Sequence, residues 1–203
     1  MTNTDKVMRP NKKIVVLDFE TTGFNVLNGD RVTEVGAITI DGKTGEEMGS
    51  FDALVYTDKQ IPKKVQELTG ITNEMLDKYG MDEELVKSVL QHLCEDAIVV
   101  AHNASFDFSY LKWQFNIEPK LFYDTLTIDR ALYPKEKKHN LGTICEREGI
   151  ELTNAHRAIF DTRATVELLN KQLDKPMVGK EFMNVISGKM LKFKPANTVK
   201  VIQ

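Results

Sequence analysis

A short apolar run with acids at its end constrains this chain more than any other feature. Residues 14–19 read Ile-Val-Val-Leu-Asp-Phe, which is typical of a strand buried on both faces of a central sheet. Asp18 and Glu20 are two residues apart, so in a strand they point to the same face. Adjacent carboxylates at the end of a buried strand are costly unless cations neutralise them. The pattern favours a hard-metal site over solvated acids at a fraying strand end.

The rest of the chain predicts a mixed α/β fold. Strands are expected at 31–40 and 51–55, joined by a turn-rich connection at 41–45, so the first three strands form an antiparallel part of the sheet. Two later apolar segments, 97–101 and 121–123, alternate with helical patterns and predict parallel strands flanked by helices. Helices are expected at 62–69, 82–96, 106–115, 124–132, 140–148 and 157–172, with Ser105 as the N-cap of the third.

Size and composition exclude several classes of protein. The 203 residues suit one domain with a well-filled core, and no apolar run approaches the roughly 18 residues that a membrane span needs. The first ten residues lack the apolar segment of a signal peptide. The two cysteines, Cys94 and Cys145, provide neither a disulfide framework nor a zinc signature. These features predict a cytoplasmic protein with no membrane partner.

Charge is divided unevenly along the chain. The net charge of −3 splits into +5 for residues 171–203 and −8 for the rest. So acidic a body is a poor general binder of nucleic acid, and phosphates would need bound cations and local lysines. Lys135, Lys137 and Lys138 are candidates for such lysines, and a merely solvated charge run is the alternative.

The chain is expected to consist of three segments. Residues 1–12 form a flexible leader, 13–172 the main domain, and 173–203 a basic C-terminal tail. The tail is interpreted as a docking segment for a partner protein, an oligomer contact, or extra secondary structure packed on the body.

Two further acids and a histidine complete a constellation. Asp107 opens a helix just after a buried strand, and Asp161 begins the final helix, five residues after His156. His156 can approach Asp161 only from the loop ahead of that helix, since five residues span about 140° of helical rotation. Carboxylates that converge with one histidine suit two-metal phosphoryl chemistry, in which divalent ions roughly 4 Å apart activate a water and stabilise the leaving oxygen. Histidine is suited to act as the general base.

Three motifs carry a family resemblance. Residues 18–23 (DFETTG), 102–107 (HNASFD) and 156–161 (HRAIFD) resemble, in order and spacing, the three exonuclease motifs of the DEDDh (DnaQ-like) 3′→5′ exonucleases. Residues 67–72, 139–145 and 149–153 also resemble the family. The likeness covers about residues 13–169 and is greatest to the proofreading domains of PolC-type bacterial DNA polymerase III.

The resemblance implies a ribonuclease H-like fold and a set of roles for the site. Asp18, Glu20, Asp107 and Asp161 correspond to the ligands of two Mg²⁺ or Mn²⁺ ions, and His156 to the general base. Glu20 would also orient the attacking water. The residues that match substrate contacts are Thr21, Thr22, Gly23, Phe24, Leu68, Thr69 and His102. Phe24 could stack on a base or fold onto the body, and a structural role is the favoured reading of His102.

The predicted function is metal-dependent removal of nucleoside 5′-monophosphates from single-stranded DNA 3′ ends, in proofreading or repair. A replicative DNA polymerase is the partner expected for the tail. One alternative is a 3′→5′ exoribonuclease, since discrimination of the 2′-hydroxyl depends on pocket shape. The other is a catalytically silent module that binds nucleic acid or a polymerase.

Overall fold

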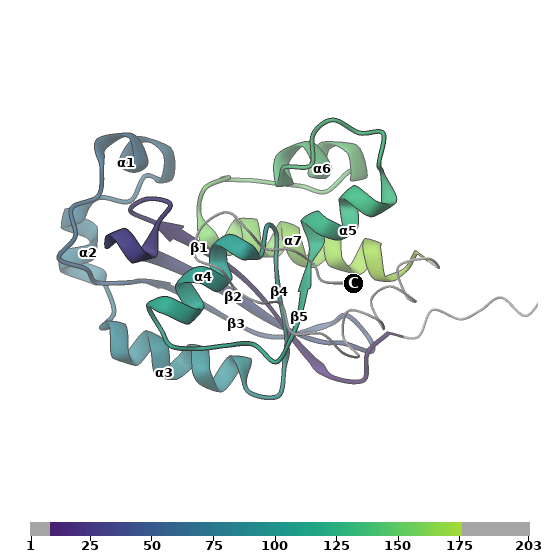
Figure 1. The fold of residues 1–203 in the computed structure, drawn as a ribbon, viewed down its shortest axis with the longest axis horizontal. Coiled ribbons are helices and arrows are strands. Elements are labelled where there is room, and N and C mark those ends of the chain that lie inside the picture. The colour runs from purple at the N-terminus through teal and green to yellow at the C-terminus, as the bar shows by residue number, and fades with distance from the viewer. Residues whose placement is uncertain (1–8, 176–203) are drawn as a thin grey trace, which may run out of the picture.

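The computed structural model describes residues 9–175, where a mixed sheet has helices on both faces (Figure 1). Residues 1–8 of the expected leader and 176–203 of the expected tail lie outside the described residues. The strand order is β3-β2-β1-β4-β5, with β2 antiparallel to β1 and β3, and β4 parallel to β1 and β5. The predicted fold class is therefore confirmed. The strands are β1 (Lys13–Thr21), β2 (Val32–Asp41), β3 (Glu47–Leu54), β4 (Ile98–Ala101) and β5 (Leu121–Asp124).

Strand β1 is central because its apolar side chains are buried on both faces. Val15, Leu17 and Phe19 contribute to a core with α3 (Glu83–Cys94) and α4 (Ser105–Trp113). Ile14 and Val16 belong to a second core with α5 (Thr125–Leu132) and α7 (Ala158–Leu173). Because side chains alternate along a strand, Asp18 and Glu20 continue the row of Ile14 and Val16 and face α7. The remaining helical elements are η1 (Val26–Asn28), α1 (Lys63–Thr69), α2 (Asn73–Tyr79) and α6 (Leu141–Glu148).

Helices α2, α3, α5 and α6 begin at side-chain caps that the sequence contains. Asp82 caps α3, Thr72 caps α2, and Asn140 caps α6 by accepting a hydrogen bond from the backbone of its helix. The expected cap of α4 is wrong: Ser105 is the first helical residue, and Ala104 is the N-cap. The carboxylate of Asp124, from the end of β5, instead accepts hydrogen bonds from the backbone of Asn103 and Ala104.

A buried ionic network joins α5 to α6. The carboxylate of Asp129 is fully buried, accepts a hydrogen bond from Nδ1 of His139 at 2.6 Å, and pairs with the guanidinium of Arg147. Arg147 also lies 4.1 Å from the ring centroid of Tyr133. The network fixes both ends of the loop that carries Lys135, Lys137 and Lys138, here called the basic loop.

Arg9 connects the start of the described fold to its end. Its guanidinium donates to the side chain of Asn170 at 2.9 Å and to the carboxylate of Asp174 at 2.9 Å, both at the C-terminal end of α7. The last residues of the expected leader therefore contact the main domain. No helix within residues 9–175 is long and apolar enough to cross a membrane.

Candidate active site

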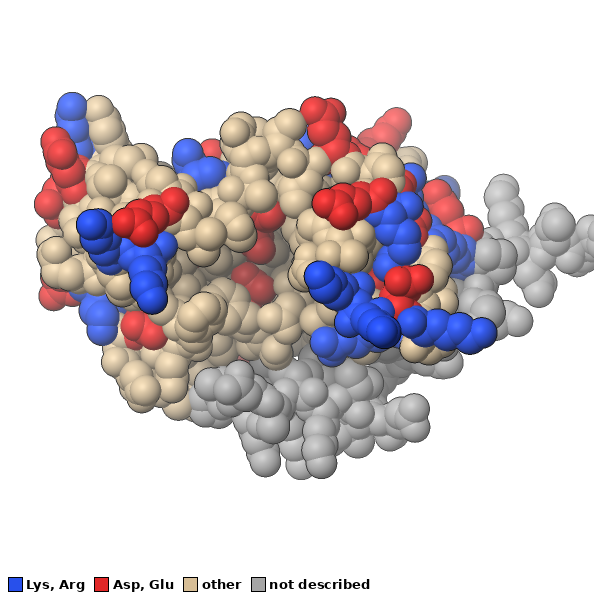
Figure 2. All heavy atoms as spheres, turned by 90° about the horizontal axis from the view of Figure 1, so that it is seen from above, with Lys and Arg blue, Asp and Glu red and all other residues tan. Residues whose placement is uncertain are grey.

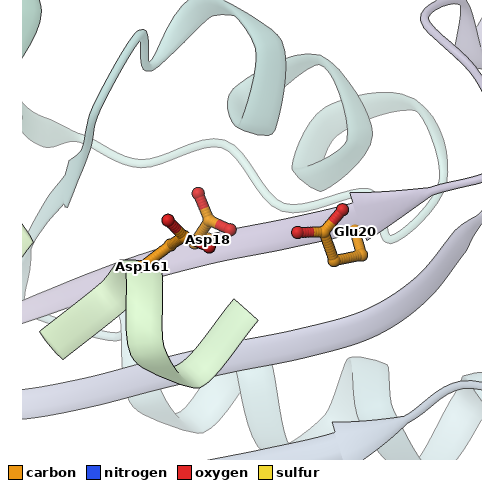
Figure 3. A group of neighbouring side chains, drawn as sticks. All are labelled: Asp18, Glu20 and Asp161. Carbon is orange, nitrogen blue, oxygen red and sulfur yellow. The ribbon is translucent and has the colours of Figure 1, made fainter. Parts of the chain in front are cut away.

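Three acids converge where β1 ends and α7 begins. Asp18 and Glu20 project from one face of β1, and Asp161 reaches toward them from the first turn of α7 (Figure 3). One carboxylate oxygen from each residue lies within 4.8 Å of the other two, and all three side chains are partly buried. The site therefore depends on the seating of α7 against the sheet.

Asp107 lies beside this group in the first turn of α4. Its side chain is only 2% exposed, and Oδ1 accepts a hydrogen bond from the backbone N–H of Phe19 at 3.1 Å. Phe19 lies between Asp18 and Glu20, so Asp107 sits against the strand that carries them. The structure thus places three of the four predicted ligands within mutual reach and the fourth against the backbone of β1.

Burial, together with neighbouring negative charges, raises the pKa values of these carboxylates. Burial, followed by the charge of Asp107, raises the pKa of Asp18 well above its usual range. Burial and the charges of Asp161 and Glu34 raise the pKa of Glu20 to about 8. Burial likewise raises the pKa of Asp107 and of Asp161, although backbone N–H groups partly offset both shifts. Hard divalent cations would relieve this repulsion, and a cluster of carboxylate oxygens is the donor set that Mg²⁺ or Mn²⁺ prefers. The residues fit such ions.

His156 lies in the loop ahead of α7, as its spacing from Asp161 requires. Its backbone N–H donates to Oδ2 of Asp161 at 2.8 Å, and its side chain is exposed. Its φ angle is +70°, a left-handed conformation that is uncommon for a residue with a side chain. The imidazole is thus tethered to the acidic group through its own backbone.

The segment after β1 is hydrogen-bonded to the rest of the protein, and its aromatic side chain is exposed. The carbonyl oxygen of Gly23 accepts hydrogen bonds from the hydroxyls of Thr21 at 2.5 Å and Tyr110 at 2.8 Å. The hydroxyl oxygen of Thr22 accepts from the backbone N–H of Arg31 at 3.0 Å. Phe24, by contrast, is 86% exposed. Of the four residues predicted here to contact substrate, Phe24 has a large solvent-exposed side chain. The hydroxyls of Thr21 and Thr22 are hydrogen-bonded to the backbone and fix the conformation of the segment.

The other predicted substrate contacts differ in accessibility. Leu68 is 56% exposed on α1, whereas Thr69 is buried and its hydroxyl donates to the carbonyl oxygen of Val65 at 2.9 Å. Nε2 of His102 lies 3.0 Å from the carbonyl oxygen of His139, and Nδ1 lies 2.9 Å from the Thr125 hydroxyl. Burial lowers the pKa of His102. Its ring nitrogens are thus engaged within the protein, in keeping with the structural reading.

Sequence reasoning missed two residues beside the acids, Glu34 and Arg157. Glu34 is only 1% exposed, stands opposite Glu20 in the β1–β2 pairing, and forms an ion pair with Arg157 at 2.6 Å. A charged residue inside the largely apolar and buried strand β2 was the available signal. Such a residue is rarely buried without a partner.

The face above the site is hollowed, with acidic side chains visible at its floor (Figure 2). The lobe with α1 and the lobe with α5 and α6 flank the hollow, and cationic side chains gather on the outer parts of both. Lys135, Lys137 and Lys138 are all exposed on the second lobe, and none forms an ion pair with another described residue. A polyanion could therefore approach along the rim while cations neutralise the floor.

Comparison with known proteins agrees with this geometry. A family model described as "Exonuclease" matches residues 15–169. The chain belongs to this exonuclease family. It is 39% identical over 165 residues to a PolC-type DNA polymerase III of Bacillus subtilis, covering 78% of this chain and 11% of the polymerase. It is also 33% identical over 159 residues to the 3′-5′ exonuclease DinG of Staphylococcus saprophyticus, covering 76% of this chain and 17% of that protein.

A solved structure supports the fold assignment. E. coli exonuclease I in complex with a dT13 oligonucleotide superposes with a TM-score of 0.72 at 20% identity, over 84% of this chain and 43% of that one. The chain thus has the ribonuclease H-like fold of these exonucleases. It spans less than a fifth of the length of the two sequence relatives.

Proposed function

We propose that this protein is a metal-dependent 3′→5′ exonuclease that releases nucleoside 5′-monophosphates from DNA 3′ ends. The observation that carries the proposal is the convergence of Asp18, Glu20 and Asp161 within 4.8 Å where β1 ends and α7 begins. The relatives named above are a PolC-type DNA polymerase III and a 3′-5′ exonuclease, which supports DNA as the substrate and proofreading or repair as the setting.

All four acids are proposed as metal ligands, and Glu20 has a second role. Asp18, Glu20, Asp107 and Asp161 would hold two divalent ions, Mg²⁺ or Mn²⁺. When bound, such ions supply Lewis-acid activation of a water and stabilise the leaving 3′ oxygen. Glu20 would also orient the attacking water, a role supported by the position of its carboxylate beside Asp18 and Asp161 (Figure 3).

His156 would accept the proton of the attacking water on an imidazole nitrogen. Its ring is exposed, and its backbone N–H is bonded to the carboxylate of Asp161, one of the proposed ligands. A general base of this kind contributes about 10²- to 10⁴-fold to a rate.

The exposed apolar side chains would position the terminal nucleotides. Phe24 contacts Phe106 edge-on, with ring centroids 6.3 Å apart, and leaves most of its surface free for stacking on a base. Leu68 offers a second apolar surface from α1. The basic loop would contact phosphates of the strand outside the hollow, and residues 173–203 would dock on a polymerase.

The decisive experiment is digestion of a 5′-labelled single-stranded DNA oligomer with Mg²⁺ or Mn²⁺. A ladder that shortens from the 3′ end and releases mononucleotides is expected, with no digestion in a chelator. Asp161→Asn keeps the shape of the side chain and should abolish the ladder. Glu167→Gln, at an exposed position of the same helix, should not.

Two further arms test the substrate and the tail. Faster digestion of an RNA oligomer of equal length would favour the exoribonuclease alternative. Digestion of neither, with every metal tried, would contradict the proposal and favour a binding module. A chain ending at residue 175 should keep its activity and lose affinity for a polymerase; unchanged affinity would contradict the docking role.

A further inference from the structure

Glu34 is buried, and both of its carboxylate oxygens accept hydrogen bonds from residues 157–158. Oε1 accepts hydrogen bonds from Nε of Arg157 at 2.9 Å and from Nη2 at 2.6 Å. Oε2 accepts from the backbone N–H of Ala158 at 2.9 Å. The carboxylate therefore binds both the side chain and the backbone at the start of α7.

This contact replaces a cap that α7 lacks. Arg157 is the N-cap residue of α7, and its side chain makes no capping hydrogen bond. The first N–H groups of a helix have no partner within the helix, so Glu34 supplies one acceptor from the sheet. Thr162, in the second turn, also donates to the carbonyl oxygen of Gly36 at 3.1 Å. The first turns of α7 are thus anchored to β2.

The same contact adjoins a segment with an unusual backbone. Asn154 and His156 have φ angles of +50° and +70°, and residues with side chains adopt this region at a cost that neighbouring contacts must offset. His156 is held on one side by its N–H bond to Asp161. On the other side it is joined directly to Arg157, whose guanidinium is oriented by Glu34.

From this geometry we propose that Arg157, fixed by Glu34, is a positioning residue that places His156 for catalysis. The inference rests on the proposed function, in which His156 is the general base. Two of the guanidinium nitrogens are committed to a buried carboxylate, so Arg157 acts through its neighbour rather than on a phosphate. The two-point geometry also explains why an arginine suits this position, since a lysine presents a single charged nitrogen.

A double-mutant cycle tests the proposal. Arg157→Lys keeps the charge and removes the two-point contact, and it should lower kcat about 10- to 100-fold, because a displaced catalytic group loses much of its effect. KM for DNA should not change. In a His156→Ala background, Arg157→Lys should have almost no further effect on the residual single-turnover rate. Arg163→Lys is the matched control, because Arg163 pairs at 3.0 Å with Glu47 on the surface and should leave both rates unchanged.

Each contrary result has a separate meaning. An equal loss in the two backgrounds would show that Arg157 acts on the substrate, the ions or the fold, and would overturn the proposal. A wild-type rate in Arg157→Lys would overturn it as well. If wild-type protein digests neither DNA nor RNA, the proposed function fails instead.

Amide hydrogen exchange provides a readout that needs no residual activity. Arg157→Lys should accelerate exchange of the His156 amide, which donates to Asp161, while amides in the middle of α7 stay protected. Glu34→Gln, which keeps the side-chain shape, should act in the same direction. Unchanged exchange of the His156 amide in both variants would overturn the proposal.

Discussion

Gly36→Ala would insert a methyl group where α7 crosses β2. A Cβ atom at Gly36 would lie 2.4 Å from the carbonyl carbon of Ala158, 2.5 Å from its oxygen and 2.6 Å from the nitrogen of Ile159. Ordinary contact begins at 3.4 Å, and the obstructing atoms are backbone, so they cannot rotate aside. The difference requires α7 to move by about 1 Å, together with Asp161 in its first turn.

Two effects of that displacement can be measured. A misplacement of about 1 Å in a reacting group costs about 10²-fold in rate, so kcat of Gly36→Ala should fall by about that factor. Overpacking of this kind costs about 2 kcal/mol, which for a chain of this size lowers Tm by about 4–8 °C. Both should be followed in one preparation, with the exonuclease rate measured well below Tm.

Gly49→Ala is the matched control, because a Cβ at Gly49 in β3 would meet nothing within 4 Å. It should leave the rate and Tm unchanged. Wild-type values for both quantities in Gly36→Ala would refute the view that α7 is rigidly seated. A lower Tm with a wild-type rate would refute the claim that this seating positions Asp161.

Three further predictions concern the pH response, the ionic network and the basic loop. Burial and neighbouring charges raise the pKa of Glu20 to about 8, so its carboxyl group binds a proton more tightly in the folded than in the unfolded protein. The metal-free protein should therefore lose stability as pH rises from about 4.5 to 8, which can be measured as a falling Tm in the presence of a chelator. Glu20→Gln should flatten that decline, and an equally steep decline in this variant would contradict the assignment. Asp129→Asn leaves Arg147 without its buried partner and should lower the free energy of unfolding, measured by urea denaturation, by about 3 kcal/mol. The control Lys87→Ala breaks an exposed ion pair and should change that free energy by less than about 1 kcal/mol. Equal losses in the two variants would contradict this account. Alanine at all three lysines of the basic loop should weaken DNA binding and reduce the slope of log K against log salt by up to about 2, with kcat at saturation unchanged; an unchanged slope would mean that these lysines are merely solvated.

The central strand and the acids were predictable because their signals are local. The apolar run before Asp18 identifies a buried strand, and the two-residue spacing to Glu20 fixes a common face. The motif around Asp161 places that acid at a helix start. Convergence of the three then follows from the fold that the motifs imply.

Features set by distant partners were not predictable. Strand β3 begins at Glu47, whereas the sequence predicted a start at residue 51. Its first four residues are exposed on an edge strand and show no apolar alternation, so they carry no sequence signal of a strand. The importance of Glu34 depends on Arg157, 123 residues away in the sequence. The engagement of His102 likewise depends on a carbonyl oxygen at His139, so no local pattern reveals it.

The Arg9 contact bears on how this fold can be joined to another protein. One arginine side chain reaches from the approach to β1 to Asn170 and Asp174 at the end of α7, so the polypeptide enters and leaves the described fold at neighbouring points. A unit whose ends meet can be inserted into a loop of a host protein without stretching either partner. The same geometry would let this fold be grafted onto another DNA-handling scaffold through two short linkers, with the acidic hollow left open to the strand.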